Sequence, residues 1–280
     1  MRLTDIRNIL HADVLYGEDL LDRQVKTGFA CDLISEMLVH ANSGTLLITS
    51  LTNPHVIHTA QVTDAAGVIF VGGKKPNLSM VSTANGSRVP LLATDHLTFK
   101  CCVLLSEQGI KEEERIPASV TEASGVNSKS EPRLIIEFAI HEKDFLMAGE
   151  SASKTKKALQ QLGLKGEAVK NTAIIVYEAA MNVVIHANHG QIKIVIVPEE
   201  VLVVTEDVGP GIPDIELAME EGYSTAPNEI REMGFGAGMG LPNIKRCSDE
   251  LKIRSESGVG TVLEARIHLR QKEDVRREEG

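Results

Sequence analysis

The stretch GFGAGMGL, residues 234–241, places four glycines at alternate positions near the C-terminal end of the chain. Such a run suits neither a packed strand nor a helix, because ordered glycine loses more backbone freedom than any other residue. It does allow backbone N–H groups to approach an anionic ligand closely. Pro242 follows at a position that suits the first turn of a helix, and a helix N-terminus favours phosphate. The stretch predicts a phosphate-binding loop, with a plain flexible loop as the alternative.

Two shorter turns flank this run in the sequence. Upstream, DVGPGI at residues 207–212 follows VLVVT at residues 201–205, which is typical of a buried strand. A carboxylate at a strand end, followed by a tight Gly-Pro-Gly turn, can accept a hydrogen bond from a ligand amine. The alternative is a surface turn in which Asp207 is incidental. Downstream, GVGT at residues 258–261 lies between two strand-like runs and by itself predicts a hairpin turn.

Residues 177–190, YEAAMNVVIHANHG, have the apolar pattern of a helix that ends at Gly190. Glu178, Asn182 and His186 are four residues apart, so they share one face of this helix. An acid, an amide and an imidazole on one stripe of an otherwise apolar helix are costly unless the stripe faces a cleft. The spacing therefore predicts a site, and the alternative is a solvated polar face.

These four blocks, in this order, resemble the ATP-binding domain shared by gyrase and sensor histidine kinases, over about residues 133–269. The resemblance implies an α/β fold, the two-layer sandwich of the histidine-kinase-type ATPase (Bergerat) fold. Within that superfamily, the compact length and the helix with Glu178 and Asn182 are most similar to the anti-sigma-factor serine/threonine kinases.

The resemblance also implies residue roles. Glu178 would be the general base, Asn182 would hold Mg²⁺, and Asp207 would accept a hydrogen from the adenine amino group. Phosphoryl transfer needs mainly positioning, a metal ion and charge stabilisation, which these residue types can supply. The remaining residues would bind other parts of ATP: Gly209, Gly211 and Thr261 on the adenine side, and Gly234, Gly236, Gly238, Met239, Gly240 and Leu241 over the phosphates.

The function that follows is a regulatory protein that binds ATP·Mg²⁺ and phosphorylates a serine or threonine of a partner protein, such as an anti-anti-sigma-like substrate or a sigma factor. One alternative is a non-catalytic module that binds a partner when ATP is bound. A second is the ATPase half of a histidine kinase acting in trans. The presence of Glu178 favours catalysis. His141, the only candidate phospho-acceptor motif, follows an alternating β-rich run and is expected at a strand end rather than on a dimerising helix.

Composition limits the classes of partner and compartment. The chain has 280 residues, a formal net charge of −10 and no Trp, so aliphatic cores and no nucleic-acid-binding surface are expected. No apolar run approaches 18 residues, which predicts a cytoplasmic protein without a membrane segment. The four cysteines form no Cys-x-x-Cys pair and are expected to be buried reduced thiols, with Cys101 and Cys102 on opposite sides if they lie in a strand.

A change in composition divides the chain into domains. Residues 107–131 are rich in Glu, Lys and Ser and lack apolar periodicity, which is typical of a linker. The boundaries predicted from it are an N-terminal domain over residues 1–108, a linker over 109–132, an ATP-binding domain over 133–270 and a frayed charged tail over 271–280.

The N-terminal half alternates strand-like and helix-like runs, which predicts a mostly parallel α/β domain. The expected strands are residues 45–49, 67–71 and 89–94, and the expected helices are residues 31–41, 55–61 and 77–84. This half resembles the DRTGG domain, although the five-letter motif that names that family is not present. The resemblance implies a ligand-sensing or dimerising role, and hence a homodimer, rather than catalysis.

Overall fold

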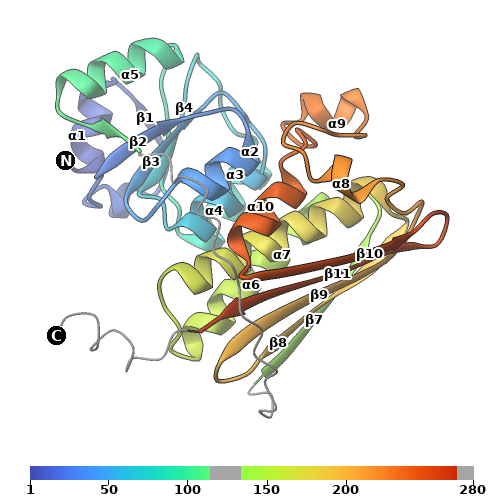
Figure 1. The fold of residues 1–280 in the computed structure, drawn as a ribbon. Coiled ribbons are helices and arrows are strands. Elements are labelled where there is room, and N and C mark those ends of the chain that lie inside the picture. The colour runs from blue at the N-terminus through green and yellow to red at the C-terminus, as the bar shows by residue number, and fades with distance from the viewer. Residues whose placement is uncertain (114–133, 270–280) are drawn as a thin grey trace. The chain divides into compact units, whose positions relative to one another are not determined.

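A computed structural model describes residues 1–113 and 134–269 (Figure 1). The chain forms two compact units. The first comprises Met1–Pro117 together with Asn228–Phe235, and the second comprises Ala118–Pro227 with Gly236–Gly280. Most of the predicted linker, and the predicted tail, lie outside the described residues.

The first unit is built on a six-stranded sheet in the order β1-β5-β4-β3-β2-β6. The strands from β2 to β6 pair in parallel, and β1 adds to β5 antiparallel. The mostly parallel sheet predicted from the sequence is therefore confirmed. The strands are β1 (Asp13–Tyr16), β2 (Thr27–Ala30), β3 (Thr45–Thr49), β4 (Gly67–Phe70), β5 (Leu91–Ala93) and β6 (Lys111–Glu112).

Helices connect these strands, as parallel pairing requires. They are α1 (Leu3–Ile9), α2 (Ile34–His40), α3 (His55–Thr63), α4 (Leu78–Ser87) and α5 (Thr98–Glu107), with a 3₁₀ turn η1 at Glu18–Leu20. β3, β4 and β5 are buried at every position, which explains why they are uninterrupted apolar runs in the sequence. β6 lies inside the segment predicted as linker, and its Glu112 pairs with Gly28.

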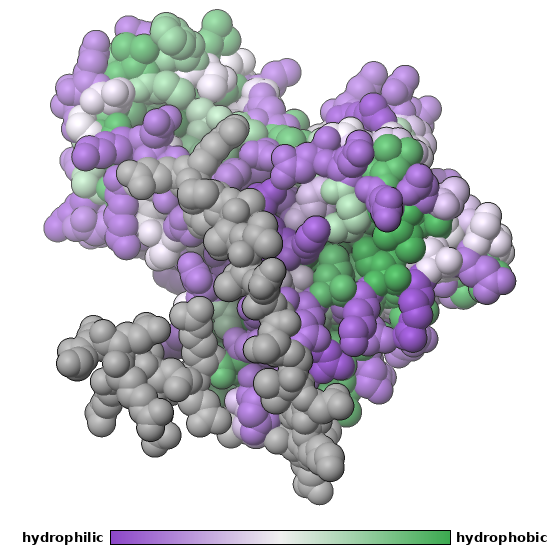
Figure 2. Space-filling model, in the orientation of Figure 1, coloured by the Kyte–Doolittle hydropathy of each residue, from purple (hydrophilic) through white to green (hydrophobic). Residues whose placement is uncertain are grey.

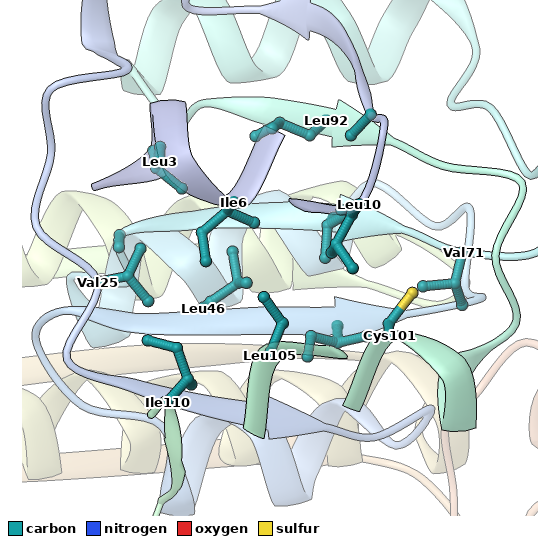
Figure 3. Packing of buried hydrophobic residues seen from close by; sticks show 14 of the residues in the cluster. Leu3, Ile6, Leu10, Val25, Leu46, Val71, Leu92, Cys101, Leu105 and Ile110 are labelled. Atoms are coloured by element: carbon teal, nitrogen blue, oxygen red, sulfur yellow. The ribbon is translucent and has the colours of Figure 1, made fainter. Parts of the chain in front are cut away.

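One part of the core of this unit joins α1 and α5 to the sheet (Figure 3). Leu3, Ile6 and Leu10 pack with Leu46 and Leu92 of the strands. Cys101 and Leu105 of α5 complete the cluster. The two adjacent cysteines thus lie on a helix and not in a strand. Cys101 is buried and Cys102 is half-buried because neighbours on a helix are about 100° apart rather than opposite.

The surface of α5 is unusually apolar at its start. Leu97, which precedes the helix, is 71% exposed, and Phe99 in its first turn is 81% exposed. Figure 2 shows hydrophobic residues gathered over this helix, with hydrophilic residues elsewhere on the same unit.

A short segment that is distant in sequence completes the first unit. It is Asn228–Phe235, which contains α9 (Asn228–Glu232). Phe235 is buried and its ring lies edge-on to the imidazole of His55, 4.9 Å away between centroids. The side-chain amide of Asn53 donates a hydrogen bond to the carbonyl of Met233 at 3.0 Å.

The second unit is a two-layer sandwich (Figure 1). A five-stranded antiparallel sheet in the order β10-β11-β9-β8-β7 forms one layer. Its strands are β7 (Leu134–His141), β8 (His189–Ile196), β9 (Glu200–Val208), β10 (Glu250–Glu256) and β11 (Gly260–His268). The helices are α6 (Phe145–Gln161), α7 (Glu167–His186) and α10 (Gly240–Cys247), with the short α8 (Ile215–Ala218) between β9 and the glycine run.

Helix α7 is the centre of this unit. It packs against α6, α10 and the sheet, and all residues from Thr172 to Met181 are buried. The helix is long and apolar enough to cross a membrane. However, 72% of its most apolar 18-residue stretch is buried inside the protein, as in the core helix of a globular domain.

The predicted end of this helix is wrong. α7 ends at His186, and Gly190 belongs to β8, where it pairs with Asp207. A Cβ atom on Gly190 would lie 2.8 Å from the carbonyl oxygen of Glu206, so close strand packing explains this glycine. His141 ends β7, as expected.

Candidate functional site

The polar stripe of α7 runs from the core to the surface. Glu178 is 5% exposed, Asn182 is half-buried and His186 is exposed at the last position of the helix. The three side chains of the predicted stripe therefore differ in exposure, and Glu178 is the most strongly removed from water.

The carboxylate of Glu178 has a specific partner. The side-chain amide of Asn243, on α10, donates a hydrogen bond to its Oε1 at 2.8 Å. Burial raises the pKa of Glu178 to about 7, and the hydrogen bond from Asn243 and the charge of Arg246 oppose that increase. A carboxyl group that titrates near neutral pH is suited to take a proton from a hydroxyl group during a reaction.

Gly240 lies directly beside this carboxylate, at the start of α10. A Cβ atom on Gly240 would lie 3.0 Å from Oδ1 of Asn182 and 3.6 Å from Oε2 of Glu178. The missing side chain therefore keeps the first turn of α10 in contact with both polar residues of α7. The backbone N–H groups of Gly240 and Leu241 precede the first bond of this helix, which Asn243 N donates to the carbonyl of Met239, and such groups favour an anion.

The same place fits a magnesium ion. Asn182 supplies a side-chain oxygen, the donor that Mg²⁺ prefers, and Mg²⁺ usually takes few protein ligands because phosphate oxygens and water complete its shell. Across residues 1–113 and 134–269 no cluster of three His, Cys, Asp or Glu side chains could hold a metal by itself. The arrangement suits a metal that arrives with a phosphorylated ligand.

A second group of predicted residues gathers around Asp207, near the end of β9. Its Oδ1 accepts a hydrogen bond from the backbone N–H of Thr261 at 3.1 Å. Burial raises the pKa of Asp207, and the hydrogen bond from Thr261 opposes that increase. Gly260 has a φ of 149°, and a Cβ atom there would overlap the carbonyl of Asp207. β11 therefore approaches this carboxylate as closely as backbone can.

Gly209 and Gly211 are explained by packing within the protein. A Cβ atom on Gly209 would lie 2.9 Å from Cα of Ala187, and Gly211 has a φ of 71° and lies against the backbone of Glu256. The hydroxyl of Ser255 accepts a hydrogen bond from Ile212 N at 2.7 Å and lies 2.8 Å from Oγ1 of Thr261. This set fixes the turn after β9 to the β10–β11 hairpin.

The glycine run divides between two environments. Gly234, Gly236 and Gly238 have φ values of 86°, 66° and 75°, in the left-handed region that favours glycine. Gly234 belongs to the first unit and packs against Leu51, whereas the run from Gly236 onward belongs to the second.

In the second unit, the carbonyl of Gly238 accepts a hydrogen bond from Gly222 N at 3.1 Å. Met239 is the N-cap residue of α10, and Leu241 lies in its first turn. Among the residues predicted to cover phosphates, Gly240 lies in contact range of Glu178 and Asn182.

The sequence interpretation missed three residues of this region: Asn243, Ser255 and Gly260. Asn243 had a detectable signal, because a buried-face position three residues after Gly240 carries an amide among Pro242, Ile244 and Cys247. Ser255 had none, since a serine in a strand is uninformative until its neighbours are known.

Comparisons with known proteins identify a family for each half of the chain. Residues 169–271 match the model of the histidine kinase-, DNA gyrase B-, and HSP90-like ATPase family, and residues 5–107 match the DRTGG domain. The serine/threonine-protein kinase RsbT of Bacillus subtilis is 40% identical over 97 residues, which cover 33% of this chain and 67% of that protein. An anti-sigma F factor of Caldanaerobacter subterraneus is 32% identical over 102 residues, covering 35% of this chain and 68% of that protein.

Among solved structures, the histidine kinase domain from Erythrobacter litoralis EL346 has a TM-score of 0.30 and 18% identity, over 54% of this chain and 69% of that one. That likeness is too slight to carry an argument. The family matches span residues 5–107 and 169–271, and the chain covers about two thirds of the length of each of the two relatives. The chain belongs to the histidine kinase-, DNA gyrase B-, and HSP90-like ATPases, with a DRTGG domain preceding its ATPase domain.

Proposed function

We propose that the second unit binds ATP with Mg²⁺ and transfers the γ-phosphoryl group to a serine or threonine of a regulatory partner protein. The observation that carries this proposal is the Glu178 carboxyl, which is buried, hydrogen-bonded to Asn243 and close to Gly240 at the start of α10. A module that only sensed ATP would need groups that bind adenine and the metal ion. It would not need a buried carboxyl group with a near-neutral pKa beside the phosphate loop.

Each residue then has a defined task. Asp207 accepts a hydrogen bond from the adenine amino group, with Thr261 holding its other oxygen. Asn182 holds Mg²⁺, which neutralises charge on the phosphates when it is bound. Glu178 takes the proton of the attacking hydroxyl as the new phosphorus–oxygen bond forms, and ADP leaves. The similarity to RsbT, which is named a serine/threonine-protein kinase, supports transfer of the phosphoryl group from ATP to a serine or threonine.

A second candidate function is partner binding controlled by ATP without catalysis. Its support is the similarity to a protein named anti-sigma F factor, which points to a sigma-factor-like or anti-anti-sigma-like partner. Self-association through the first unit is a further part of the proposal, because Leu97 and Phe99 expose an apolar surface on α5. Analytical ultracentrifugation of the full chain would test that part.

The test compares Glu178→Gln with Asn182→Ala in the full-length protein. With γ-labelled ATP and candidate partners, wild type should transfer label to serine or threonine. The affinity of Glu178→Gln for Mg·ATP should stay within about twofold of the wild-type value. Its rate of label transfer should be at least ~100-fold lower, because only the general base is lost. Asn182→Ala should weaken nucleotide binding only when Mg²⁺ is present.

Glu167→Gln is the matched control, since it removes an exposed carboxylate from the start of the same helix. It should change neither affinity nor transfer. A wild-type protein that binds Mg·ATP but labels no partner, and hydrolyses no ATP, would leave the binding module as the function.

A further inference from the structure

Helix α10 carries one amide on its buried face. Pro242, Asn243, Ile244 and Cys247 are its buried residues, and Asn243 is 1% exposed. A buried amide is costly unless it is hydrogen-bonded, so its presence among apolar neighbours requires an explanation.

One of the two N–H groups of this amide is used on a single partner. Nδ2 donates to Oε1 of Glu178 at 2.8 Å, across 65 residues of sequence. Oδ1 is buried and finds no hydrogen-bond partner within the described parts of the chain. The hydrogen bond to Glu178 is thus the interaction that explains a buried amide at this position. It forms even though the amide oxygen has no partner among the described residues.

This hydrogen bond fixes which oxygen of Glu178 faces the site. With Oε1 held by Asn243, Oε2 lies on the side of Gly240, 3.6 Å from where a Cβ atom of that residue would be. Asn182 Oδ1 lies on the same side, 3.0 Å from the same point. The carboxylate therefore presents one defined oxygen toward the first turn of α10 and the proposed metal ligand.

We propose that Asn243 is a positioning residue, which orients the Glu178 carboxylate so that Oε2 accepts the proton of the attacking hydroxyl. The inference rests on the proposed phosphoryl transfer and adds the residue that sets the geometry of its base. Because α10 begins at Gly240, near the end of the glycine run, the bond also ties the orientation of Glu178 to the helix that follows the proposed phosphate loop.

The experiment uses two variants of the same shape in the full-length protein. Asn243→Val and Asn243→Thr are both β-branched and differ mainly in a methyl or a hydroxyl group, and the hydroxyl can donate to Glu178. Val should lower kcat about 10- to 100-fold, and Thr should retain most of the activity that Val loses. The affinity for Mg·ATP should stay within about twofold for both, because binding does not depend on the base.

A double-mutant cycle separates positioning from general damage to the fold. In a Glu178→Gln background, Val and Thr at position 243 should have equal residual kcat, since Asn243 acts only through the carboxylate. Lys245→Ala, an exposed change on the same helix, is the control and should leave kcat and the melting temperature unchanged.

The outcomes are distinguishable. Equal kcat for Val and Thr in the wild-type background, or a Val defect that persists with Glu178→Gln, overturns the positioning role while leaving the kinase reaction intact. A loss of Mg·ATP affinity that equals the loss of turnover also overturns it, because Asn243 would then serve the pocket and not the base. Absence of phosphoryl transfer by wild type is a failure of the proposed function itself.

Discussion

At the scale of single residues, the proposed recognition of adenine depends on Asp207. Asp207→Asn keeps an oxygen for the N–H of Thr261 but turns the other position into a donor, which cannot accept from an adenine amino group. We expect ATP affinity to fall by about 1.5–3 kcal/mol, the scale of a hydrogen bond to a charged group. That corresponds to roughly ten- to a hundredfold in Kd by calorimetry.

Glu206→Gln is the control for this prediction, because Glu206 is the exposed neighbour of Asp207 on β9. It removes the same charge without touching the hydrogen bond to Thr261, and ATP affinity should not change. Wild-type affinity in Asp207→Asn would show that the adenine does not lie at this carboxylate.

At the scale of elements, a substitution at the start of α10 would distinguish the proposed phosphate binding from adenosine binding. Gly240→Ala places a methyl group 3.0 Å from Oδ1 of Asn182. We expect about a tenfold loss of Mg·ATP affinity, or ~1.4 kcal/mol, with adenosine affinity unchanged, because the methyl group lies beside the proposed metal ligand and not at Asp207. Equal losses for both ligands would show that the change damages the fold.

Gly86→Ala serves as the control glycine. It lies in α4, and a Cβ atom there meets no atom within 4 Å. Gly238 is a poorer position than Gly240 for testing phosphate binding. A side chain there would overlap the backbone of Gly222 and Tyr223, so Gly238→Val would deform the loop whether or not it binds phosphate.

Element positions could be predicted where the pattern is local. The strand at Thr45–Thr49 follows from a short apolar run of β-formers, and the helix with Glu178 follows from its period. The end of α7 could not be predicted, because Gly190 is typical of a helix stop and only strand pairing to Asp207 explains it otherwise. The sequence analysis did not predict helix α5. Some of its apolar residues are exposed, so its apolar residues do not mark a single buried face.

At the scale of the whole molecule, the two units should respond to pH in opposite directions. In the second unit, burial raises the pKa of Glu178 from 4.5 to about 7, so the folded state holds a proton that the unfolded state releases. The contribution of Glu178 to the free energy of unfolding is fully present below pH 4.5. It falls by roughly 3 kcal/mol as the pH rises to about 7. Glu178→Gln should lack this dependence.

In the first unit, burial lowers the pKa of His55 from 6.5 to about 3. The unfolded state then binds the proton more readily than the folded state. The contribution of His55 to the free energy of unfolding is therefore fully present above pH 6.5 and falls as the pH decreases toward 3. His55→Phe should remove that loss. Calorimetry between pH 5 and 8 on wild type and both variants checks the pair of predictions. Parallel pH shifts of the two unfolding transitions, unaffected by either substitution, would contradict them.

The sequence by itself determined the fold class and the order of the elements that form the candidate site. Glycines at positive φ, a carboxylate at a strand end and an acid and amide four apart on a helix are local requirements, so they are visible within a few adjacent residues. Family resemblance could be seen for the same reason, and both family matches confirm it.

Only the tertiary structure decided which partners the two carboxyl groups of the candidate site have and how far their pKa values shift. The partner of Glu178 is Asn243, 65 residues away, and the partner of Asp207 is the backbone of Thr261, 54 residues away. Burial and hydrogen bonding set the pKa of each carboxyl, and both depend on segments that meet only when the sheet and α10 close around α7. A sequence pattern identifies which groups are present, whereas folding determines which of them lose water and what they bind in its place.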